Sequence, residues 1–143
     1  MSMPAEEHSA RRPQVPLSHL QPSQLYISTE KLAHVRATFD PLQPALWPPI
    51  PVKQLDGRLV MTDGHTRAVA ACTAGLTELP LIWDCDELDW QAYRICVAWC
   101  RESGIYTVAD LAPRTIDPSS YQRLWLDRCA RMHRALARSR TDS

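Results

Sequence analysis

The sequence predicts an α+β protein in which a small mixed sheet with helices is followed by a helical extension at the carboxyl end. Short apolar runs of strand length lie before residue 84, Asp56-Gly57 favours a tight hairpin turn, and apolar residues recur at helical spacing after residue 87. With 143 residues, 45% of them hydrophobic, the chain can form one core. We expect a disordered arm at 1–16, one domain at 17–86, a helical extension packed on it at 87–138, and a tail at 139–143.

A strand and a helix are expected first. Residues 24–27 form a short apolar stretch typical of a strand. Ser28 can then cap a helix over 29–39, with Glu30 in the first turn, where the helix dipole favours an acid. Five prolines between residues 40 and 51 exclude regular structure from the next segment, because proline lacks a backbone donor.

A hairpin, a second helix and a further strand follow. Residues 51–55 and 58–62 flank Asp56-Gly57, the dipeptide that favours a type I′ turn. Residues 67–74 are rich in small side chains and stop at a glycine, which predicts a helix packed closely on the sheet. The continuous apolar run at 79–83 has the length of a buried strand.

The rest of the chain is expected to be helical. From Leu88 onward, two apolar stripes at helical spacing predict a helix that is buried on two sides. Residues 107–111 suggest a short helical turn. Asp117-Pro118 predicts the start of a last helix through Leu136, because aspartate is a good N-cap and proline suits the first helical position.

The composition narrows the functional classes. The 16 basic and 16 acidic residues cancel, so net charge gives no general attraction to nucleic acid or anionic membranes. No apolar run approaches the roughly 20 residues that cross a bilayer, and residues 1–16 lack the apolar part of a signal peptide, so we expect a cytoplasmic protein with no membrane partner.

The chain has five cysteines, an odd number, and we expect them to be free thiols. Cys96 and Cys100 lie four residues apart on a predicted helix. We favour core packing for this pair; the alternative is half of a zinc site.

The segment after the predicted hairpin has the residue types of an anion-binding loop. A helix start leaves several backbone N–H groups without intrahelical acceptors. Gly64 allows close approach of a ligand, Thr66 offers a hydroxyl, and Arg67 offers a planar fork for two phosphate oxygens. Asp63 can cap the helix or help to hold a divalent cation. The alternative interpretation is an ordinary turn and cap, with His65 at the surface.

A set of short motifs resembles the core of the ParB/sulfiredoxin superfamily over about residues 17–83. The motifs are Ile50-Pro51-Val52, the hairpin at Asp56-Gly57, Asp63-Gly64-His65-Thr66-Arg67-Ala68, Ala70-Ala71, Gly75-Leu76 and Leu79-Pro80-Leu81. The resemblance implies that the loop and the start of its helix hold the phosphates of a nucleotide, either ATP/ADP or CTP, with Mg²⁺.

Differences within the loop distinguish the branches of that superfamily. Sulfiredoxins have a Gly-Gly-Cys-His-Arg loop with a nucleophilic cysteine, and His65 stands at that position here. Partition-type ParB proteins have Gly-Glu-Arg-Arg, of which Gly64 and Arg67 remain. The free serine kinases have Asp-Gly-His-His-Arg, from which only Thr66 departs. Similarity to the kinases implies that His65 and Arg67 contact phosphates and that Asp63 assists the metal or the acceptor hydroxyl.

A kinase also needs a carboxylate that orients the acceptor hydroxyl or takes its proton. Glu30 is the candidate, because the start of the first helix can face the loop in such a fold. The alternative for Glu30 is a purely structural role as a favourable acid in the first helical turn.

Two functional classes follow. The first is a phosphotransferase for a small-molecule, serine-like hydroxyl, or a nucleotide hydrolase, using ATP or ADP with Mg²⁺. The second is a nucleotide-sensing regulator related to chromosome-partition ParB, in which the C-terminal helices contact DNA or a protein; an interaction domain without a ligand is a further alternative.

The last helix has a basic face and an apolar stripe. Its basic face carries Arg131, Arg134 and Arg138, which suit DNA phosphates or, as we favour, a solvated helix end. The apolar stripe of the last helix can close the core or a homodimer interface.

Overall fold

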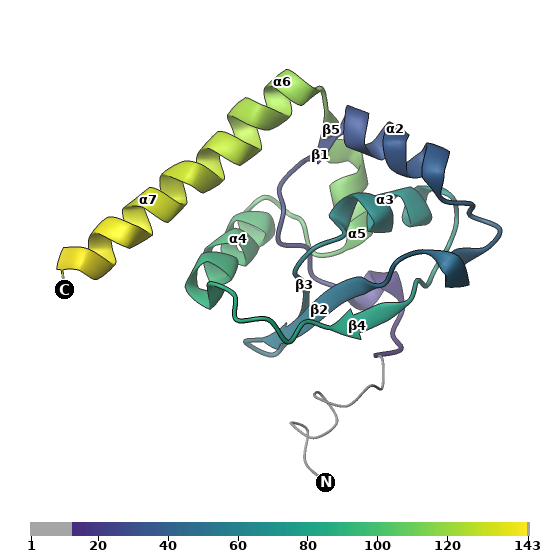
Figure 1. Cartoon of the computed structure of the whole chain (residues 1–143), viewed down its shortest axis with the longest axis horizontal. Helices are drawn as coiled ribbons and strands as arrows, with labels where there is room; N and C mark the ends of the chain where they lie inside the picture. Colours follow the sequence, from purple (N-terminus) through teal and green to yellow (C-terminus); the bar gives the residue numbers. More distant parts are fainter. Residues whose placement is uncertain (1–12, 143) are drawn as a thin grey trace, which may run out of the picture.

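The computed structural model describes residues 13–142 and has the mixed α+β architecture that the sequence predicts (Figure 1). Residues 1–12 of the expected arm lie outside the described range. Val15, within that expected arm, packs against the core, and the amide of Leu17 donates to Thr77 O (2.8 Å). Short 3₁₀ turns lie at Leu17–His19, Pro44–Leu46 and Ala112–Arg114.

The central sheet has three strands in the order β3-β2-β4, formed by Arg58–Met61, Ile50–Leu55 and Leu81–Trp83. Strands β2 and β3 are antiparallel, and β2 and β4 are parallel. Asp56 and Gly57 have φ values of 53° and 80°. Positive φ at both central residues is the requirement of a type I′ turn, so the predicted hairpin is confirmed.

The first strand differs from the prediction. β1 is Ile27–Ser28 rather than residues 24–27, and it pairs in parallel with β5 (Thr115–Ile116) in a separate two-stranded sheet. The residues before it are held by other partners: Gln24 Nε2 donates to Tyr26 O (2.8 Å), and Leu25 O accepts from Arg114 Nε (2.7 Å). Local apolar pattern could not reveal this pairing, because the partner strand lies almost 90 residues away.

Two helices bring the predicted loop beside the first helix of the chain. Helix α2 (Thr29–Thr38) is capped by Ser28, whose hydroxyl accepts from the Lys31 amide (3.5 Å), as predicted. Helix α3 (His65–Thr73) starts two residues earlier than predicted and packs against α2 and against α5 (Val108–Leu111). Its buried alanines let α3 lie close to its neighbours.

The carboxyl-terminal part contains α4 (Trp90–Glu102) and a long continuous rod. The rod consists of α6 (Pro118–Tyr121), a π-turn (Gln122–Leu126) and α7 (Asp127–Asp142), and its middle lies against α4 (Figure 1). Asp117 caps α6 with proline at the first position, as predicted. The expected tail at 139–143 is wrong for its described residues, because α7 runs to Asp142 and Arg140 donates to both carboxylate oxygens of Asp89 (2.8 and 3.0 Å).

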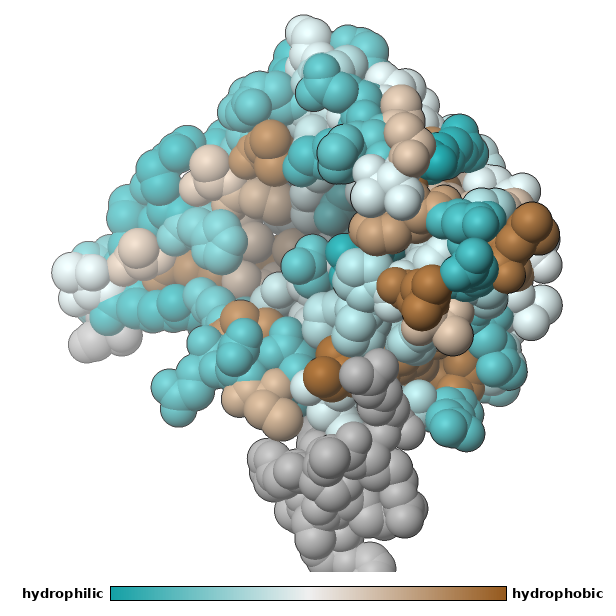
Figure 2. Space-filling view, turned by 45° about the vertical axis from the view of Figure 1, so that its right-hand side comes forward, coloured by the Kyte–Doolittle hydropathy of each residue, from teal (hydrophilic) through white to brown (hydrophobic). Residues whose placement is uncertain are grey.

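One apolar core holds these elements together, and a small cluster of Leu55, Val60 and Val97 joins the hairpin to α4. Cys96 and Cys100 are buried and unoxidised, and within residues 13–142 no group of three or more His, Cys, Asp or Glu side chains is placed to hold a metal ion. No helix among the described residues is long and apolar enough to cross a membrane. Figure 2 shows a surface that is hydrophilic over most of this face, with smaller apolar patches.

Candidate functional site

The predicted loop joins the end of β3 to α3, and its backbone depends on one glycine. Gly64 is the N-cap of α3 and has φ +77°, in the left-handed region. A Cβ at this position would lie 2.8 Å from Ile50 Cδ1 and 2.9 Å from Arg67 Nη2. Both the backbone conformation and the close packing therefore require glycine.

The start of α3 has backbone donors but no side-chain cap. The first intrahelical bond runs from the Ala68 amide to Gly64 O (3.0 Å), so the amides of His65, Thr66 and Arg67 have no acceptor within the helix. Asp63, which was expected as a possible cap, instead accepts the Gly64 amide through Oδ1 (2.8 Å). Its side chain remains exposed beside the loop.

His65 is buried rather than exposed at the surface, and its protonation state follows from its contacts. Its Nε2 accepts the backbone amide of Ser23 (2.9 Å), and its side chain is only 4% exposed. Burial lowers the pKa of His65 from 6.5 to about 4, against the opposing effect of the Asp63 charge. The ring is therefore neutral near pH 7. Because an amide can only donate, the ring proton must be on Nδ1, and Nε2 is not available as a general base.

Arg67 is partly tied to the proline-rich loop. Its Nη2 donates to Pro49 O (3.1 Å), while its Nε is buried without a hydrogen-bond partner. A buried donor without a partner is costly and rare in native proteins. The Nε–H of Arg67 therefore has no hydrogen-bond acceptor among the described residues.

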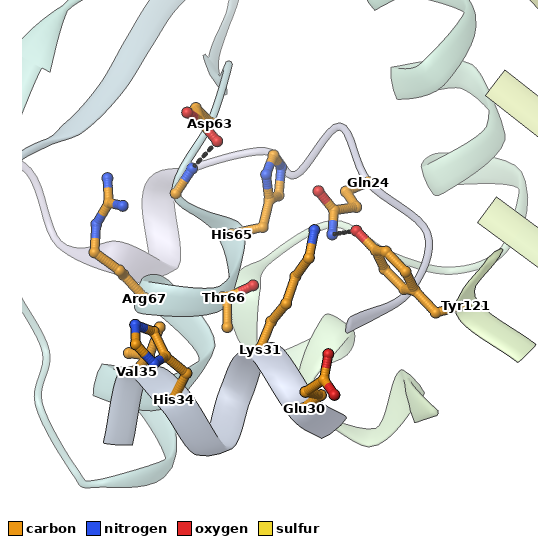
Figure 3. A pocket seen from close by; sticks show the side chains of 11 residues that line it. Gln24, Glu30, Lys31, His34, Val35, Asp63, His65, Thr66, Arg67 and Tyr121 are labelled. Atoms are coloured by element: carbon orange, nitrogen blue, oxygen red, sulfur yellow. Dashed lines mark hydrogen bonds between the residues drawn. The ribbon is translucent and has the colours of Figure 1, made fainter. Parts of the chain in front are cut away.

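The loop opens into a cavity of about 580 Å³ between α2, α3 and α6 (Figure 3). All six residues proposed from the sequence line this one cavity: Glu30, Asp63, Gly64, His65, Thr66 and Arg67. Their side chains come from α2 and from the loop with α3, and Glu30 and Asp63 are exposed there. The structure brings these residues together; their chemical roles remain predictions.

Five further side chains line the cavity that the sequence had not suggested. Lys31 and His34 extend from α2, and Lys31 Nζ lies 5.1 Å from the centre of the Tyr121 ring (Figure 3). The Tyr121 hydroxyl accepts from Gln24 Nε2 (3.0 Å). Lys31, His34 and Val35 are spaced three and four residues apart, so they lie on the same side of α2. Because Ser28 fixes the start of this helix, the sequence could have indicated that Lys31 and His34 share one side. Tyr121 carried no such signal, since it lies over 50 residues beyond the loop.

The cavity has the character of an anion site with adjacent carboxylates. Lys31 and Arg67 supply positive charge, and the first amides of α3 add the positive end of its dipole. The carboxylates of Glu30 and Asp63 supply the oxygen ligands that hard divalent cations prefer. Such a site can hold a phosphate group together with a metal ion.

Comparison with known proteins finds a match among solved structures but none among family models or curated sequences. No protein-family model matches the chain, and no curated protein matches its sequence. Among solved structures, the chain is similar to the crystal structure of protein Atu1540 from Agrobacterium tumefaciens, with a TM-score of 0.45 and 12% sequence identity. The match covers 77% of this chain and 63% of that one.

Proposed function

We propose that this protein is a ParB/sulfiredoxin-like nucleotide-binding protein that transfers a phosphoryl group from ATP or ADP to the hydroxyl of a small molecule. One observation carries the proposal. The cavity at the start of α3 combines uncapped helix amides with the side chains of Arg67 and Lys31, which come from two different helices. This combination suits a flexible polyphosphate better than a single small anion, because its donors come from two separate helices that line the cavity.

In this proposal the nucleotide phosphates bind at the amides of His65, Thr66 and Arg67. The Thr66 hydroxyl adds a donor, and the positive side chains of Lys31 and Arg67 neutralise charge. Positioning and charge neutralisation are the main requirements of phosphoryl transfer. His65 acts through Nδ1–H or as a support for the loop, since its Nε2 is held by Ser23.

Mg²⁺ fits the carboxylates that line the cavity. This ion keeps several waters and needs only one or two protein carboxylates beside the phosphates. Asp63 is exposed and close to the uncapped helix start, so it would hold the ion. When bound, Mg²⁺ supplies charge to the phosphate oxygens.

The transfer step uses Glu30. The acceptor oxygen forms a bond to the terminal phosphorus while the bond from that phosphorus to the bridging oxygen breaks. The leaving nucleotide keeps the electron pair of the broken bond, and Glu30 takes the hydroxyl proton. The products are a phosphate ester and ADP, or AMP when ADP is the donor.

A second candidate is a nucleotide-sensing regulator that uses CTP and binds DNA through α7. It is favoured by the exposed arginines of the rod, in particular Arg123 and Arg131, which line a groove of about 530 Å³ with Tyr26 and Trp99. Binding of this kind depends steeply on salt, because each phosphate contact releases counterions. A salt-independent or absent interaction with duplex DNA would eliminate this candidate.

Calorimetric titration of ATP, ADP and CTP, with and without Mg²⁺, tests the proposed function. Replacing Arg67 with alanine should weaken binding by about 1.5 to 3 kcal/mol, the usual range for a charged hydrogen bond. The matched control is Arg58→Ala, an exposed arginine at the hairpin, which should bind like the unmodified protein. If no nucleotide binds, or if both variants bind equally well, the proposed site is wrong.

A further inference from the structure

A second cavity, of about 300 Å³, lies on the other side of the site loop. It shares three lining residues with the phosphate cavity: Gln24, Asp63 and His65. Its other walls come from α4, the π-turn and α7, elements that do not bear Lys31 or Arg67. The two cavities are therefore neighbours with a common wall and different linings.

The lining of the second cavity is about equally polar and nonpolar, with the nonpolar side chains on α4 and the rod. It includes Tyr93, Trp125 and Met132 together with the thiols of Cys96 and Cys129. The Tyr93 hydroxyl is fixed by donation to Thr62 O (2.9 Å), so its ring forms a stable wall. A volume near 300 Å³ is at the small end of ligand pockets, which combine nonpolar walls with polar groups that orient the ligand.

The charges around this cavity disfavour an acidic ligand. Among the described residues that line it there is no lysine or arginine, and its acidic side chains are Asp63 and Asp89. Asp89 is already paired with Arg140, whereas Asp63 is exposed. His133 also lines the cavity but is exposed at the surface of α7. A ligand carboxylate here would lie near Asp63 without an arginine or lysine partner.

We infer that the second cavity binds the phosphoryl acceptor, and that this acceptor is a small alcohol with an aromatic or aliphatic body and no carboxylate. The inference rests on the proposed phosphotransfer. The body of the alcohol packs among Tyr93, Trp125 and Met132, and its hydroxyl reaches the phosphate cavity past Asp63. Free serine fits poorly, because it has a carboxylate and lacks an apolar body.

Thiol footprinting tests binding without requiring catalysis. Cys129 lines the cavity and is partly exposed, whereas Cys85 is exposed on a loop and lines neither cavity. The rate of alkylation by iodoacetamide is measured at each cysteine by mass spectrometry, with 2-phenylethanol or L-serine added. By mass action, an alcohol at ten times its dissociation constant should slow Cys129 about tenfold and leave Cys85 unchanged. Equal rates with and without 2-phenylethanol, or equal protection by serine, overturn the inference.

An acceptor assay then tests the role of the bound alcohol. With ATP and Mg²⁺, 2-phenylethanol should yield its phosphate ester faster than serine yields phosphoserine. Cys129→Phe, which fills the cavity, should abolish this ester, while Cys85→Phe should not; circular dichroism and melting temperature check that both variants fold. Ester formation that is slower than phosphoserine formation overturns the assignment.

The two proposals fail in different ways. Absence of nucleotide binding in the titration removes the proposed function and the acceptor role with it. Nucleotide binding with no protection of Cys129 removes only the acceptor inference. Protection of Cys129 from alkylation is measured in the unmodified protein. The result therefore stands even if the Cys129→Phe variant fails to fold.

Discussion

Helices α3 and α4 both begin beside an aspartate, but their amino ends are completed differently. At α4, Asp89 accepts the Ala92 amide (3.2 Å) and is itself held by Arg140. At α3, the N-cap residue is Gly64. Asp63 accepts the backbone amide of Gly64, which precedes the helix, and does not accept an amide of the first helical turn. One helix start is closed by its own side chain, while the other leaves its amides facing a cavity. This difference separates a structural helix end from a candidate binding site.

The strongest test of this contrast is Gly64→Ala. The substitution adds the cost of a left-handed backbone, roughly 1–2 kcal/mol, to a crowding cost of typically 1–3 kcal/mol. We expect the free energy of unfolding to fall by about 2–5 kcal/mol, as measured by urea denaturation, and nucleotide binding to be lost. Gly57→Ala is the matched control, because Gly57 has φ +80° but nothing within 4 Å of a new Cβ. Equal effects at both glycines would show that close packing at Gly64 is unimportant.

The free energy of unfolding should depend on pH through different residues at the two helix starts: His65 at α3 and Asp89 at α4. His65 has a pKa of about 4 in the folded protein, below its ordinary 6.5, so protonation favours the unfolded chain. Above pH 6.5 the ring is neutral in both states. As pH falls from 6.5 to 4, the unfolded state takes up the proton first, and about 3 kcal/mol of stability should be lost.

Chemical denaturation between pH 7 and pH 4 measures this loss. In His65→Gln the loss over this interval should be much smaller, whereas the exposed His19→Gln should retain the profile of the unmodified protein. An unchanged profile in His65→Gln would mean that another group is responsible.

Asp89→Ala should have a smaller effect, limited to the closed helix start of α4. Loss of an N-cap costs typically about 1 kcal/mol. The hydrogen bond from Arg140, followed by that from the Ala92 amide, lowers the pKa of Asp89 to about 2. The contribution of this carboxylate is therefore present above pH 3.8 and is lost as pH falls through 2. Denaturation near pH 7 should show the loss in Asp89→Ala and not in Asp86→Ala, which alters an exposed loop acid.

Local chemistry allowed much of the fold to be predicted. Asp56-Gly57 specified the hairpin, Ser28 the start of α2, and Asp117-Pro118 the start of α6, because each feature is decided by residues next to it. Features that depend on distant partners were missed. The β1 pairing requires Thr115–Ile116, and the last turns of α7 are joined by Arg140 to Asp89, 51 residues earlier.

The candidate site shows the same limit. Local sequence pattern located the loop and the first helix, and the structure places Glu30 and the loop residues around one cavity. It could not show that His65 is buried against the Ser23 amide, nor that Lys31 and Tyr121 complete the cavity. Those contacts depend on how α2, α3 and the rod pack, which sequence spacing does not determine.

The π-turn at Gln122–Leu126 has a consequence for how the rod serves both cavities. Tyr121, before the turn, lines the first cavity, while Cys129 and Met132, after it, line the second. A π-turn accommodates one extra residue, and one residue corresponds to about 100° of rotation in an α-helix. Tightening this turn to α geometry would rotate α7 about its own axis by that angle and carry Met132 out of its cavity while Tyr121 stayed in place. The rotational phase of the last helix is thus set within five residues.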